Sequence, residues 1–559
     1  MKIENVRDFR RVVNIAGDRG DRVFLMEKRG KEFQKITYAE MRHLVRSLSE
    51  FLFSLGINKG DKIGILATNR IEWGIAYLSI VYGGRIAVPL DPQLKEEEIL
   101  TLMKIAEVKA VFTTERFFER VSGAGIPVIT LDDTHPIKFS EAIEKGETLL
   151  KWNGEIKVEV NPDDIASIIF TSGTTGASKG VVLTHRNFLF DADMSERLLK
   201  LIDDEIFLSV LPIHHTFEFT AGFVDPLIRG NTICYARSLK SKELLEDLKD
   251  SRATMLLGVP LLFEKLYQGI MKKIGEAGGL KGLMLKYGIN KGMRDARKKG
   301  NIPVRNFVTR KILEQAGLSS IRVMIAGGAA LKPEVEEGIR ALGIGIVQGY
   351  GLSEASPVVT INPPDRPKIG SIGLPLPETE VRIHNPDQDG IGELIVKGEH
   401  VMQGYYNNPE ATAETIMDGW LHTGDLGYMD EDGYFYITGR KKAVIVTPGG
   451  KNVFPEELEY KLQQIDIVEE VLVIGVFDSE KKGDEIMAII YPDWELLPEC
   501  TGDDRTACAR EKLEGLIKEL NAELPPYKRI KYIEVREEEF PKTTTRKIKR
   551  YLFQNVKKI

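Results

Sequence analysis

Apolar residues in the first part of the chain follow two spacings that alternate. Some segments place apolar residues three and four positions apart, which predicts amphipathic helices, and others are short apolar runs, which predict buried strands. The helical segments are 38–52, 73–82 and 96–105, and the strand segments are 62–67, 85–90 and 110–112. Alternation of this kind predicts a mostly parallel sheet that is covered by helices.

The pattern changes along the chain. A second α/β run follows from about residue 161 to 348, and beyond residue 370 short strands are separated by tight turns, which predicts a small β-barrel-like subdomain. With 559 residues the chain exceeds what one core usually serves. We expect a large N-terminal domain, residues 1–440, of two α/β subdomains and the β-barrel-like one. A small mobile α+β domain, residues 441–559, should follow.

Composition excludes several classes of protein. Hydrophobic residues make up 42% of the chain and charged residues 29%, and the net charge of -6 argues against a nucleic-acid partner. The N-terminus lacks an apolar signal core and no eighteen apolar residues run together, so we expect neither secretion nor a membrane-spanning helix. The cysteines are scattered and odd in number (Cys234, Cys500 and Cys508), which predicts a protein of the reducing cytoplasm. We expect them to form no disulfide framework and no Cys/His metal cluster.

Residues 171–185 have the composition of a phosphate-binding loop. Glycine lets the backbone approach an anion, hydroxyl groups add donors, and Lys179 adds a mobile positive charge. An apolar run at 165–170 comes before the loop, so it should leave a buried strand. The spacing excludes a nucleotide-triphosphatase P-loop, because Lys179 is followed by Gly180 and no glycine precedes it. A loop of this composition without a ligand is the alternative.

This order of residues resembles the signature of the adenylate-forming superfamily, which includes acyl-CoA synthetases, peptide-synthetase adenylation domains and luciferases. Further matches occur in the order of that family and cover nearly the whole chain. They are the Gly-rich turns at 322–330 and 346–354, Gly-Trp-Leu-His-Thr-Gly-Asp at 419–425, and the segments at 434–446, 447–457 and 540–550. We therefore identify the chain as a member of this superfamily.

The resemblance implies roles for particular residues. Tyr350 would stack on adenine, and Glu354 with Thr171 would hold Mg²⁺ on the triphosphate, because a hard cation prefers oxygen ligands. Asp425 would accept hydrogen bonds from both ribose hydroxyls, and Arg440 would reach the ribose or phosphate. The other expected ATP- or AMP-binding residues are Ser172, Gly173, Thr174, Thr175, Gly176, Lys179, Gly328, Ala329, Gln348, Gly349, Gly351, Ser353, Ile437 and Lys547.

Two further motifs imply catalytic roles. His215 lies in a Leu-Pro-x-x-His pattern that in the family lies beside the substrate carboxylate, although a histidine in an apolar stretch is often structural. Its implied role is to position the acid, because a carboxylate is already ionised near neutral pH. Lys547 matches the adenylation lysine, but Arg546 replaces the usual glycine beside it. Lys547, Glu354, His215 and Thr171 form the expected catalytic set.

The C-terminal motifs imply a second half-reaction. Lys442 occupies the hinge position of the family, and Gly449, Gly450 and Lys451 match the loop that leaves room for pantetheine. The implied chemistry converts a carboxylate and ATP to acyl-AMP and pyrophosphate. Coenzyme A then displaces AMP, so ATP, Mg²⁺ and coenzyme A are the expected cofactors and co-substrates.

The nature of the acid is a finer expectation. Residues 269–311 carry twelve Lys and Arg against two acidic residues, and this extra segment, together with Glu218, resembles the long-chain fatty-acid–CoA ligase branch. We expect a cytoplasmic enzyme whose basic segment, 270–311, touches the anionic inner membrane face, unless it is only a solvated helical surface. The sequence leaves open whether the protein is a homodimer.

Other functions remain to be weighed. The same fold serves acyl-[acyl-carrier-protein] ligases and ligases of medium-chain or aryl acids, and the motifs do not separate these. A kinase or nucleotide hydrolase is disfavoured by the spacing around Lys179. A non-catalytic nucleotide-binding scaffold is disfavoured because Glu354, Asp425, Arg440 and Lys547 are all present.

Overall fold

The structure is a computed structural model of the chain. It describes residues 6–171, 178–200, 204–276, 287–290, 292–293, 305, 307–448, 451–478, 483–502, 504–542 and 548–553.

The first large sheet has eight strands in the order β19-β9-β8-β4-β3-β5-β6-β7. The strands from β8 to β7 are parallel, whereas β9 is antiparallel to β8 and β19 is antiparallel to β9. Their bounds are β3 Lys62–Leu66, β4 Ile86–Pro89, β5 Val108–Thr113, β6 Val128–Thr130, β7 Ile137–Lys138, β8 Ile165–Thr171, β9 Lys179–Thr184 and β19 Gly404–Tyr405. The predicted alternation of strands and helices is confirmed.

Seven helices accompany this sheet in the chain. They are α1 Phe9–Gly17, α2 Tyr38–Ser54, α3 Ile71–Tyr82, α4 Glu96–Ile105, α5 Glu115–Ser122, α6 Phe139–Asn153 and α7 His185–Leu199. Every residue of α3 is buried. A helix that is apolar on all sides belongs in the interior of a large domain.

The second sheet has nine strands in the order β16-β15-β14-β13-β12-β10-β11-β1-β2. The hairpin β1–β2 from the start of the chain belongs to this sheet, and Leu25 of β1 lies opposite Ile233 of β11 in a parallel ladder. The strands are β1 Val23–Arg29, β2 Glu32–Thr37, β10 Ile206–Ser209, β11 Thr232–Tyr235, β12 Met255–Gly258, β13 Val323–Ala326, β14 Gly345–Gly351, β15 Val358–Ile361 and β16 Leu374–Pro375.

The helical elements of this region include one π-helix, η1 Glu218–Val224. The others are α8 Asp225–Arg229, α9 Ser241–Ser251, α10 Pro260–Glu276, α12 Phe307–Gln315, α13 Pro333–Ala341 and the short 3₁₀ helix η2 Ser353–Ala355. The ring of Phe219 in η1 lies 4.2 Å from that of Tyr77 in α3, and both belong to one large core cluster. The two α/β subdomains therefore share a hydrophobic interior.

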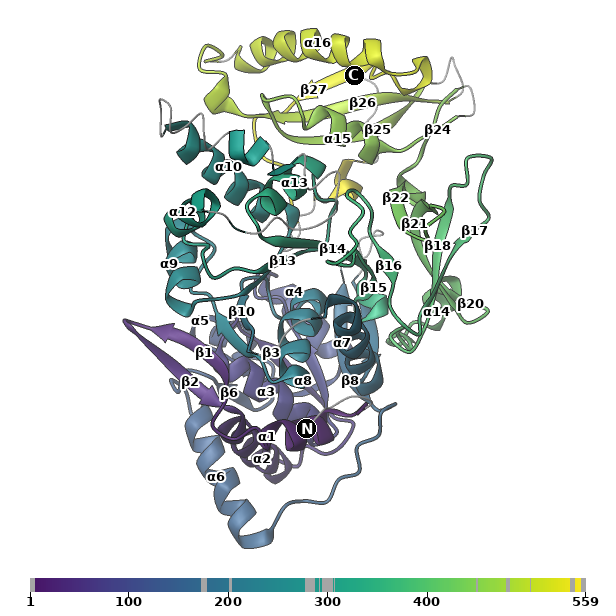
Figure 1. The fold of residues 1–559 in the computed structure, drawn as a ribbon. Helices are drawn as coiled ribbons and strands as arrows, with labels where there is room; N and C mark the ends of the chain where they lie inside the picture. Colours follow the sequence, from purple (N-terminus) through teal and green to yellow (C-terminus); the bar gives the residue numbers. More distant parts are fainter. Residues whose placement is uncertain are drawn as a thin grey trace.

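The subdomain that was predicted to be β-barrel-like is a five-stranded antiparallel sheet that stands beside the two large sheets (Figure 1). Its strands are β17 Glu380–His384, β18 Gly392–Lys397, β20 Ile416–Met417, β21 Trp420–Met429 and β22 Phe435–Arg440, with the helix α14 Pro409–Thr415. The tight turns between these strands explain why the sequence pattern changes beyond residue 370.

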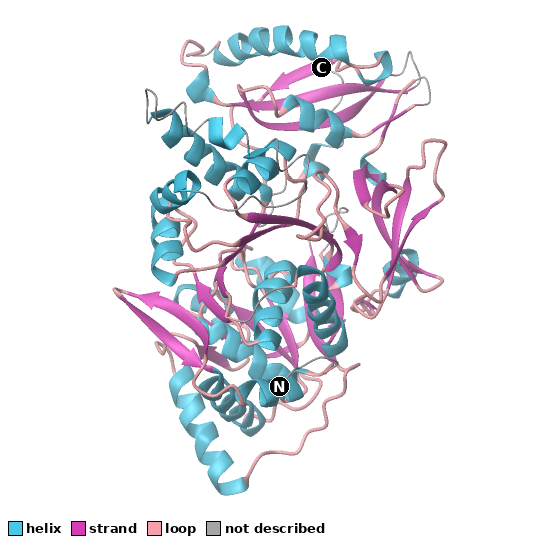
Figure 2. Cartoon of the chain, viewed as in Figure 1, coloured by secondary structure: helices cyan, strands magenta, loops and turns pink. Residues whose placement is uncertain are grey.

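The C-terminal part forms a separate α+β layer at the top of Figure 1, and Figure 2 shows its strands under a long helix. Val471, Ile490 and Leu513 belong to a core cluster of its own, and the predicted small domain is confirmed. The elements are β23 Ile445–Val446, β24 Asn452–Val453, α15 Pro455–Leu462, β25 Val468–Asp478, β26 Gly483–Pro492, α16 Arg505–Glu523 and β27 Tyr532–Val535, with the short helices η3 Lys441–Ala443, η4 Trp494–Leu496, η5 Pro526–Lys528 and η6 Arg550–Phe553.

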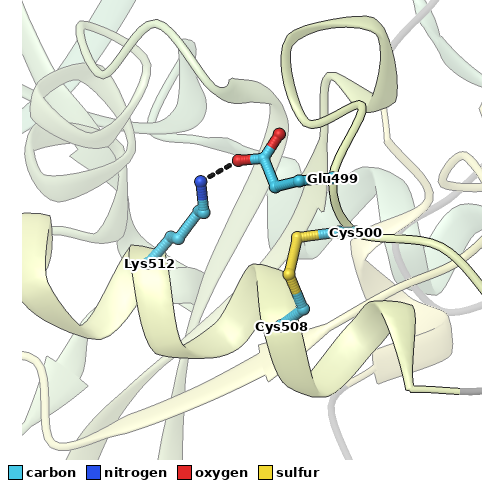
Figure 3. The surroundings of a disulfide bond; sticks show 4 residues. All are labelled: Glu499, Cys500, Cys508 and Lys512. Atoms are coloured by element: carbon cyan, nitrogen blue, oxygen red, sulfur yellow. Dashed lines mark hydrogen bonds and ion pairs between the residues drawn. A yellow bond between two sulfur atoms is a disulfide. The ribbon is translucent and has the colours of Figure 1, made fainter.

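A disulfide joins Cys500 to Cys508 in this domain (Figure 3). The expectation that the cysteines form no disulfide was wrong. The two residues are only eight positions apart, and their Cα atoms come within 5.5 Å because the chain after η4 turns back onto the first turn of α16. Lys512 and Glu499 form an ion pair beside it. Cys234 is a buried free thiol.

The basic segment falls largely outside the described residues. Only 269–276, 287–290, 292–293, 305 and 307–311 of it are described. Among the described helices, none combines the length and apolar character needed to cross a bilayer.

Candidate active site

The predicted phosphate loop joins two antiparallel strands. Its first residue, Thr171, ends β8, and Lys179 begins β9 directly opposite in the ladder. The Thr171 hydroxyl donates to the Lys179 carbonyl at 3.4 Å, which closes the stem of the loop. The intervening residues Ser172, Gly173, Thr174, Thr175 and Gly176 lie outside the described residues.

Tyr405 connects this stem to the predicted magnesium ligand. Its ring lies 4.6 Å from the Lys179 ammonium nitrogen, and its hydroxyl donates to Oε1 of Glu354 at 2.8 Å. Burial and the neighbouring Glu354 carboxylate raise the pKa of Tyr405, so its hydroxyl stays protonated and can donate. The backbone N–H of Met402 donates to the Glu354 carbonyl at 2.8 Å. Glu354 is thus fixed from both its side chain and its backbone.

Sequence reasoning did not select Tyr405. It lies in the Gly404-Tyr-Tyr-Asn-Asn-Pro409 segment, within the stretch beyond residue 370 whose pattern predicts short strands and tight turns. The pairing of β19 with β9, Tyr405 opposite Val181, is what carries this tyrosine to the phosphate loop. A single tyrosine beside a turn gives no local indication of such a contact.

Tyr350, Asp425 and Arg440 form a compact cluster between two sheets. Tyr350 lies at the end of β14, whereas Asp425 and Arg440 are paired across β21 and β22. The Tyr350 hydroxyl donates to Oδ2 of Asp425 at 2.7 Å, and Nε of Arg440 lies 2.8 Å from Oδ1. Asp425 raises the pKa of Arg440 by direct electrostatic attraction. A carboxylate has about four lone-pair sites, so Asp425 retains capacity to accept from a sugar diol.

The Gly-rich turns after β13 and β14 lie next to this cluster in the sheet. Gln348 is buried, and its side-chain oxygen accepts from the Leu331 N–H at 3.3 Å. Gly328 has φ +86°, in the left-handed region that glycine tolerates. At Gly351 a Cβ would lie 1.8 Å from the Pro357 carbonyl oxygen, so only glycine fits.

The remaining predicted residues of this region occupy strand ends and loops. Gly349 belongs to β14, Ala329 is exposed in the turn after β13, and Ile437 is a partly exposed residue of β22. The hydroxyl groups of Ser353 and Thr216 are 3.2 Å apart. This contact links the Glu354 turn to the loop that carries His215.

His215 lies in a loop between β10 and η1. Its N–H donates to the Pro212 carbonyl at 3.1 Å, and its carbonyl accepts from Phe219 at 3.0 Å. Three residues further on, Glu218 is almost completely buried. Burial raises the pKa of Glu218 to about 8, although the Ser209 side chain and a backbone N–H bond to it. Glu218 is therefore a neutral structural group of this loop below that pH.

The hinge position lies on the 3₁₀ helix that follows β22. Lys442 is exposed there, and the neighbouring Lys441 pairs with Oε2 of Glu393 at 3.0 Å. Glu393 also accepts from the N–H of Gly424 at 3.0 Å. The segment that enters the C-terminal domain is thus tied to the turn beside Asp425.

The C-terminal domain packs against β22. A Cβ on Gly439 of β22 would lie 2.8 Å from Oε2 of Glu456 in α15 and 3.2 Å from the Phe454 ring, so glycine allows this close approach. The Thr447 hydroxyl and Lys451 bond to each other across the predicted pantetheine loop. The predicted site residues Gly449, Gly450 and Lys547, and Arg546 with them, lie outside the described residues.

Two family models match the chain. The model described as AMP-binding enzyme matches residues 13–406, and the model described as AMP-binding enzyme C-terminal domain matches residues 457–547. The chain belongs to the AMP-binding enzyme family. These ranges include every N-terminal motif up to Tyr405 and reach Lys547 at the C-terminal end.

Curated relatives of similar length carry acyl-CoA ligase names. A long-chain-fatty-acid–CoA ligase of Bacillus subtilis (strain 168) is 29% identical over 556 residues, covering 92% of this chain and 89% of the relative. A 2-succinylbenzoate–CoA ligase of Bacillus cereus (strain AH820) is 30% identical over 478 residues, covering 84% and 86%. The chain is therefore of the AMP-forming acyl-CoA synthetase type, and its relatives differ in their acid.

Solved structures share the whole fold. ATP-bound MatB from Rhodopseudomonas palustris has a TM-score of 0.77 at 24% identity and covers 98% of both chains. The o-succinylbenzoate CoA synthetase MenE from Bacillus subtilis, in complex with ATP and magnesium ion, has a TM-score of 0.73 at 24% identity, covering 96% of this chain and 98% of that one. The predicted adenylate-forming fold is confirmed.

Proposed function

We propose that this protein is a long-chain fatty-acid–CoA ligase that forms an acyl-adenylate and then an acyl thioester. The proposal rests chiefly on one observation. The segment with Tyr350 and Glu354 contacts both the Asp425 motif and, through Tyr405, the stem of the predicted phosphate loop. A nucleotide base, its ribose and its phosphates would then lie along one continuous surface. The long-chain relative from Bacillus subtilis, which spans 92% of this chain, supports the choice of acid.

The first half-reaction needs positioning and charge stabilisation. A fatty carboxylate oxygen attacks the α-phosphorus of ATP, the bond from that phosphorus to the bridging oxygen breaks, and pyrophosphate leaves. Asp425 holds the ribose, while Lys179 and the loop from Ser172 to Gly176 receive the phosphates. Lys547 balances negative charge where the carboxylate and the α-phosphate meet. No protein nucleophile is required, so rate enhancement comes from orientation and electrostatics.

Glu354 and Thr171 fit the role of oxygen ligands for the nucleotide-bound magnesium ion. Both belong to the network around Tyr405 and Lys179, and both offer the hard oxygen atoms that this cation prefers. When bound, Mg²⁺ would neutralise charge on the departing pyrophosphate. The hydrogen bond from the Tyr405 hydroxyl would keep the Glu354 carboxylate oriented toward the magnesium position.

The second half-reaction uses the C-terminal loop. The thiolate of coenzyme A attacks the acyl carbonyl, and the bond from that carbon to the AMP oxygen breaks, so that AMP leaves. Gly449 and Gly450 provide room for pantetheine and Lys451 lies beside them, after rotation of the domain about Lys442. The domain boundary at 440/441 is part of this proposal.

Pyrophosphate release tests the proposed function. The purified protein is given ATP, Mg²⁺ and a panel of acids from acetate to oleate, with and without free coenzyme A. We expect release to be greatest with long acids and to rise when coenzyme A is added. Greatest pyrophosphate release with short acids would overturn the proposed long-chain substrate. Pyrophosphate release that does not change when coenzyme A is added would favour a carrier protein as the acceptor.

Lys547→Ala separates the two half-reactions. The variant should lose about 10² to 10³ in the rate of adenylation and keep its ability to convert supplied acyl-AMP to the thioester. A matched substitution of the neighbouring Lys549 controls for lost charge. Equal loss of both half-reactions in Lys547→Ala would contradict domain rotation.

A second acid class has specific support. The 2-succinylbenzoate–CoA ligase of Bacillus cereus is 30% identical to this chain over 84% of its length. The panel therefore includes 2-succinylbenzoate and simple aryl acids. Faster pyrophosphate release with one of these than with oleate would reassign the substrate and leave the adenylation chemistry intact.

We also propose that the basic segment at 270–311 contacts anionic membrane surfaces from which fatty acid is taken. Lys272 and Lys273 are exposed on α10, next to the part of the segment that is not described. Attraction of Lys and Arg to anionic lipid is screened by salt. Sedimentation with anionic vesicles, but not with neutral ones, is the expected result, and failure with both would overturn the proposal.

A further inference from the structure

Two histidines and an aspartate meet where the two large sheets approach each other. Asp91 follows β4 of the first sheet, and His214 and His215 follow β10 of the second. The potential ligand atoms of all three side chains lie within 4.8 Å of one another. Nε2 of His214 is 3.6 Å from Oδ1 of Asp91, and the two imidazole rings are 4.3 Å apart at an angle of 43°. No other group of three His, Cys, Asp or Glu residues in the described part of the chain has this geometry.

His214 supplies an independent indication that this site takes a ligand. Its side chain is 8% exposed, yet Nε2 has no hydrogen-bond partner among the described residues. The distance of 3.6 Å to Asp91 is too long for a hydrogen bond. A buried ring nitrogen without a partner costs free energy unless an ion or water satisfies it.

The loop that carries both histidines is held in place before any ligand binds. The side-chain amide nitrogen of Asn69 donates to the Ser209 hydroxyl at 2.9 Å and to the Leu211 carbonyl at 2.7 Å. Its oxygen accepts from the N–H of Ile213 at 3.0 Å. On the other side, Oδ1 of Asp91 accepts from the Gln93 N–H at 2.8 Å. These contacts fix the backbone of the histidine loop and the orientation of the Asp91 carboxylate.

We propose that Asp91, His214 and His215 bind one divalent transition-metal ion of the zinc type. Two imidazoles and one carboxylate are ligands that suit Zn²⁺, Co²⁺ or Ni²⁺ and leave further positions open to water or substrate. The nitrogen ligands select against Mg²⁺, which prefers oxygen. This site is therefore distinct in its chemistry from that of Glu354 and Thr171.

Occupation of this site inhibits acid activation. This part rests on the proposed function, and on the role that the family resemblance implies for His215, which is to position the substrate carboxylate. A metal ion that holds His215 withdraws it from the acid, and its open positions bind the carboxylate oxygens in an unproductive place. The protein would then lose adenylation activity as free zinc rises, while Mg²⁺ still serves the nucleotide.

Cobalt binding tests the site without any reference to catalysis. Chelator-treated protein is titrated with Co²⁺ in excess Mg²⁺, and its visible absorption is recorded, followed by displacement with Zn²⁺. We expect one equivalent to bind with nitrogen and oxygen ligation. Absence of saturable binding, or absorption bands typical of thiolate ligation, would overturn the proposal.

Matched variants locate the bound ion. Asp91→Asn and His214→Gln should each weaken Co²⁺ binding at least about tenfold. His43→Gln, which removes an exposed histidine paired with Glu147, should leave it unchanged. Because Asp91 is less buried than His214, Asp91→Asn keeps the proposal testable if the His214 variant fails to fold. Wild-type affinity in Asp91→Asn would contradict the site.

Pyrophosphate release then tests the consequence. Zn²⁺ should inhibit the wild-type protein, whereas Asp91→Asn should retain its basal rate and resist Zn²⁺. Inhibition of both proteins to the same degree would overturn the inhibitory role. Saturable Co²⁺ binding to a protein that activates no acid would uphold the site and refute the proposed function, so the two failures are distinguishable.

Discussion

The Tyr405 hydroxyl lies 2.8 Å from the carboxylate of Glu354. The same ring faces the ammonium group of Lys179, 4.6 Å from its centroid. One aromatic side chain therefore sets the separation between a positive and a negative group that the proposed reaction uses on the same triphosphate. The hydroxyl and the ring face perform different tasks, so they can be tested separately.

Replacement of Tyr405 by Phe removes the hydroxyl and keeps the ring under Lys179. A hydrogen bond to a charged group contributes about 1.5 to 3 kcal/mol, so we expect adenylation to slow about 10- to 100-fold. The Mg²⁺ concentration needed for half-maximal pyrophosphate release should rise. Tyr406→Phe, at the neighbouring position, is the control, and equal rates in the two variants would refute the role of Tyr405.

Asp425→Asn should raise the KM for ATP about tenfold and leave the KM for the acid unchanged. The amide keeps one acceptor oxygen but loses the charge that pairs with Arg440, and charge-assisted hydrogen bonds are the stronger ones. Steady-state kinetics with each substrate varied in turn measure both constants. Asp432→Asn, an exposed residue of the same subdomain, is the control. An equal rise in both constants would indicate general disruption instead.

Glu218 should make the protein less stable as the pH rises. Its pKa is about 8 in the folded chain and near its ordinary value of 4.5 when unfolded, so the folded state binds the extra proton between these values. The contribution of Glu218 to the free energy of unfolding is therefore most favourable below pH 4.5 and is lost as the pH rises toward 8. Each unit of difference between the two pKa values corresponds to about 1.4 kcal/mol of that free energy. The melting temperature of Glu218→Gln should therefore fall less between pH 5 and 8 than that of the wild-type protein. A slope identical to wild type would contradict the assignment.

His400 should act in the opposite direction. Burial lowers the pKa of His400 to about 3 in the folded protein, against 6.5 when unfolded, so the unfolded state binds the extra proton. Its contribution to stability is lost as the pH falls from 6.5 toward 3. His400→Leu should reduce the loss of melting temperature between pH 7 and 5, whereas His43→Gln, at an exposed histidine, should not. A greater acid sensitivity of His400→Leu would refute this sign.

Local patterns predicted much of the fold. The apolar spacing located α4 at residues 96–105 with the bounds that the structure has. The pairing of β1 with β11 was not predictable, because it joins segments about 200 residues apart and leaves no local period. The π-helix Glu218–Val224 was also missed, because almost all of its residues are buried and no polar face marks a helical period.

Motifs indicated the candidate site more completely than its supporting contacts. Tyr350, Asp425 and Arg440 were selected from three separate motifs, and the structure brings them into one cluster. Tyr405 was not selected as a residue of the candidate active site, because it reaches that site through strand pairing. Contacts of this kind depend on tertiary structure, which no spacing rule for a single segment describes.

The parallel ladder between β1 and β11 limits how the chain can be divided. The hairpin Val23–Thr37 completes the edge of the second sheet, although α2, the helix that follows it, packs with α3 in the first subdomain. A fragment that begins after residue 160 would lack this hairpin and would expose β11 as an unpaired edge strand. Exposed edges recruit other chains, so such fragments should aggregate on expression. The first subdomain would in turn carry an unsupported hairpin, and neither half can serve as an isolated unit for binding studies.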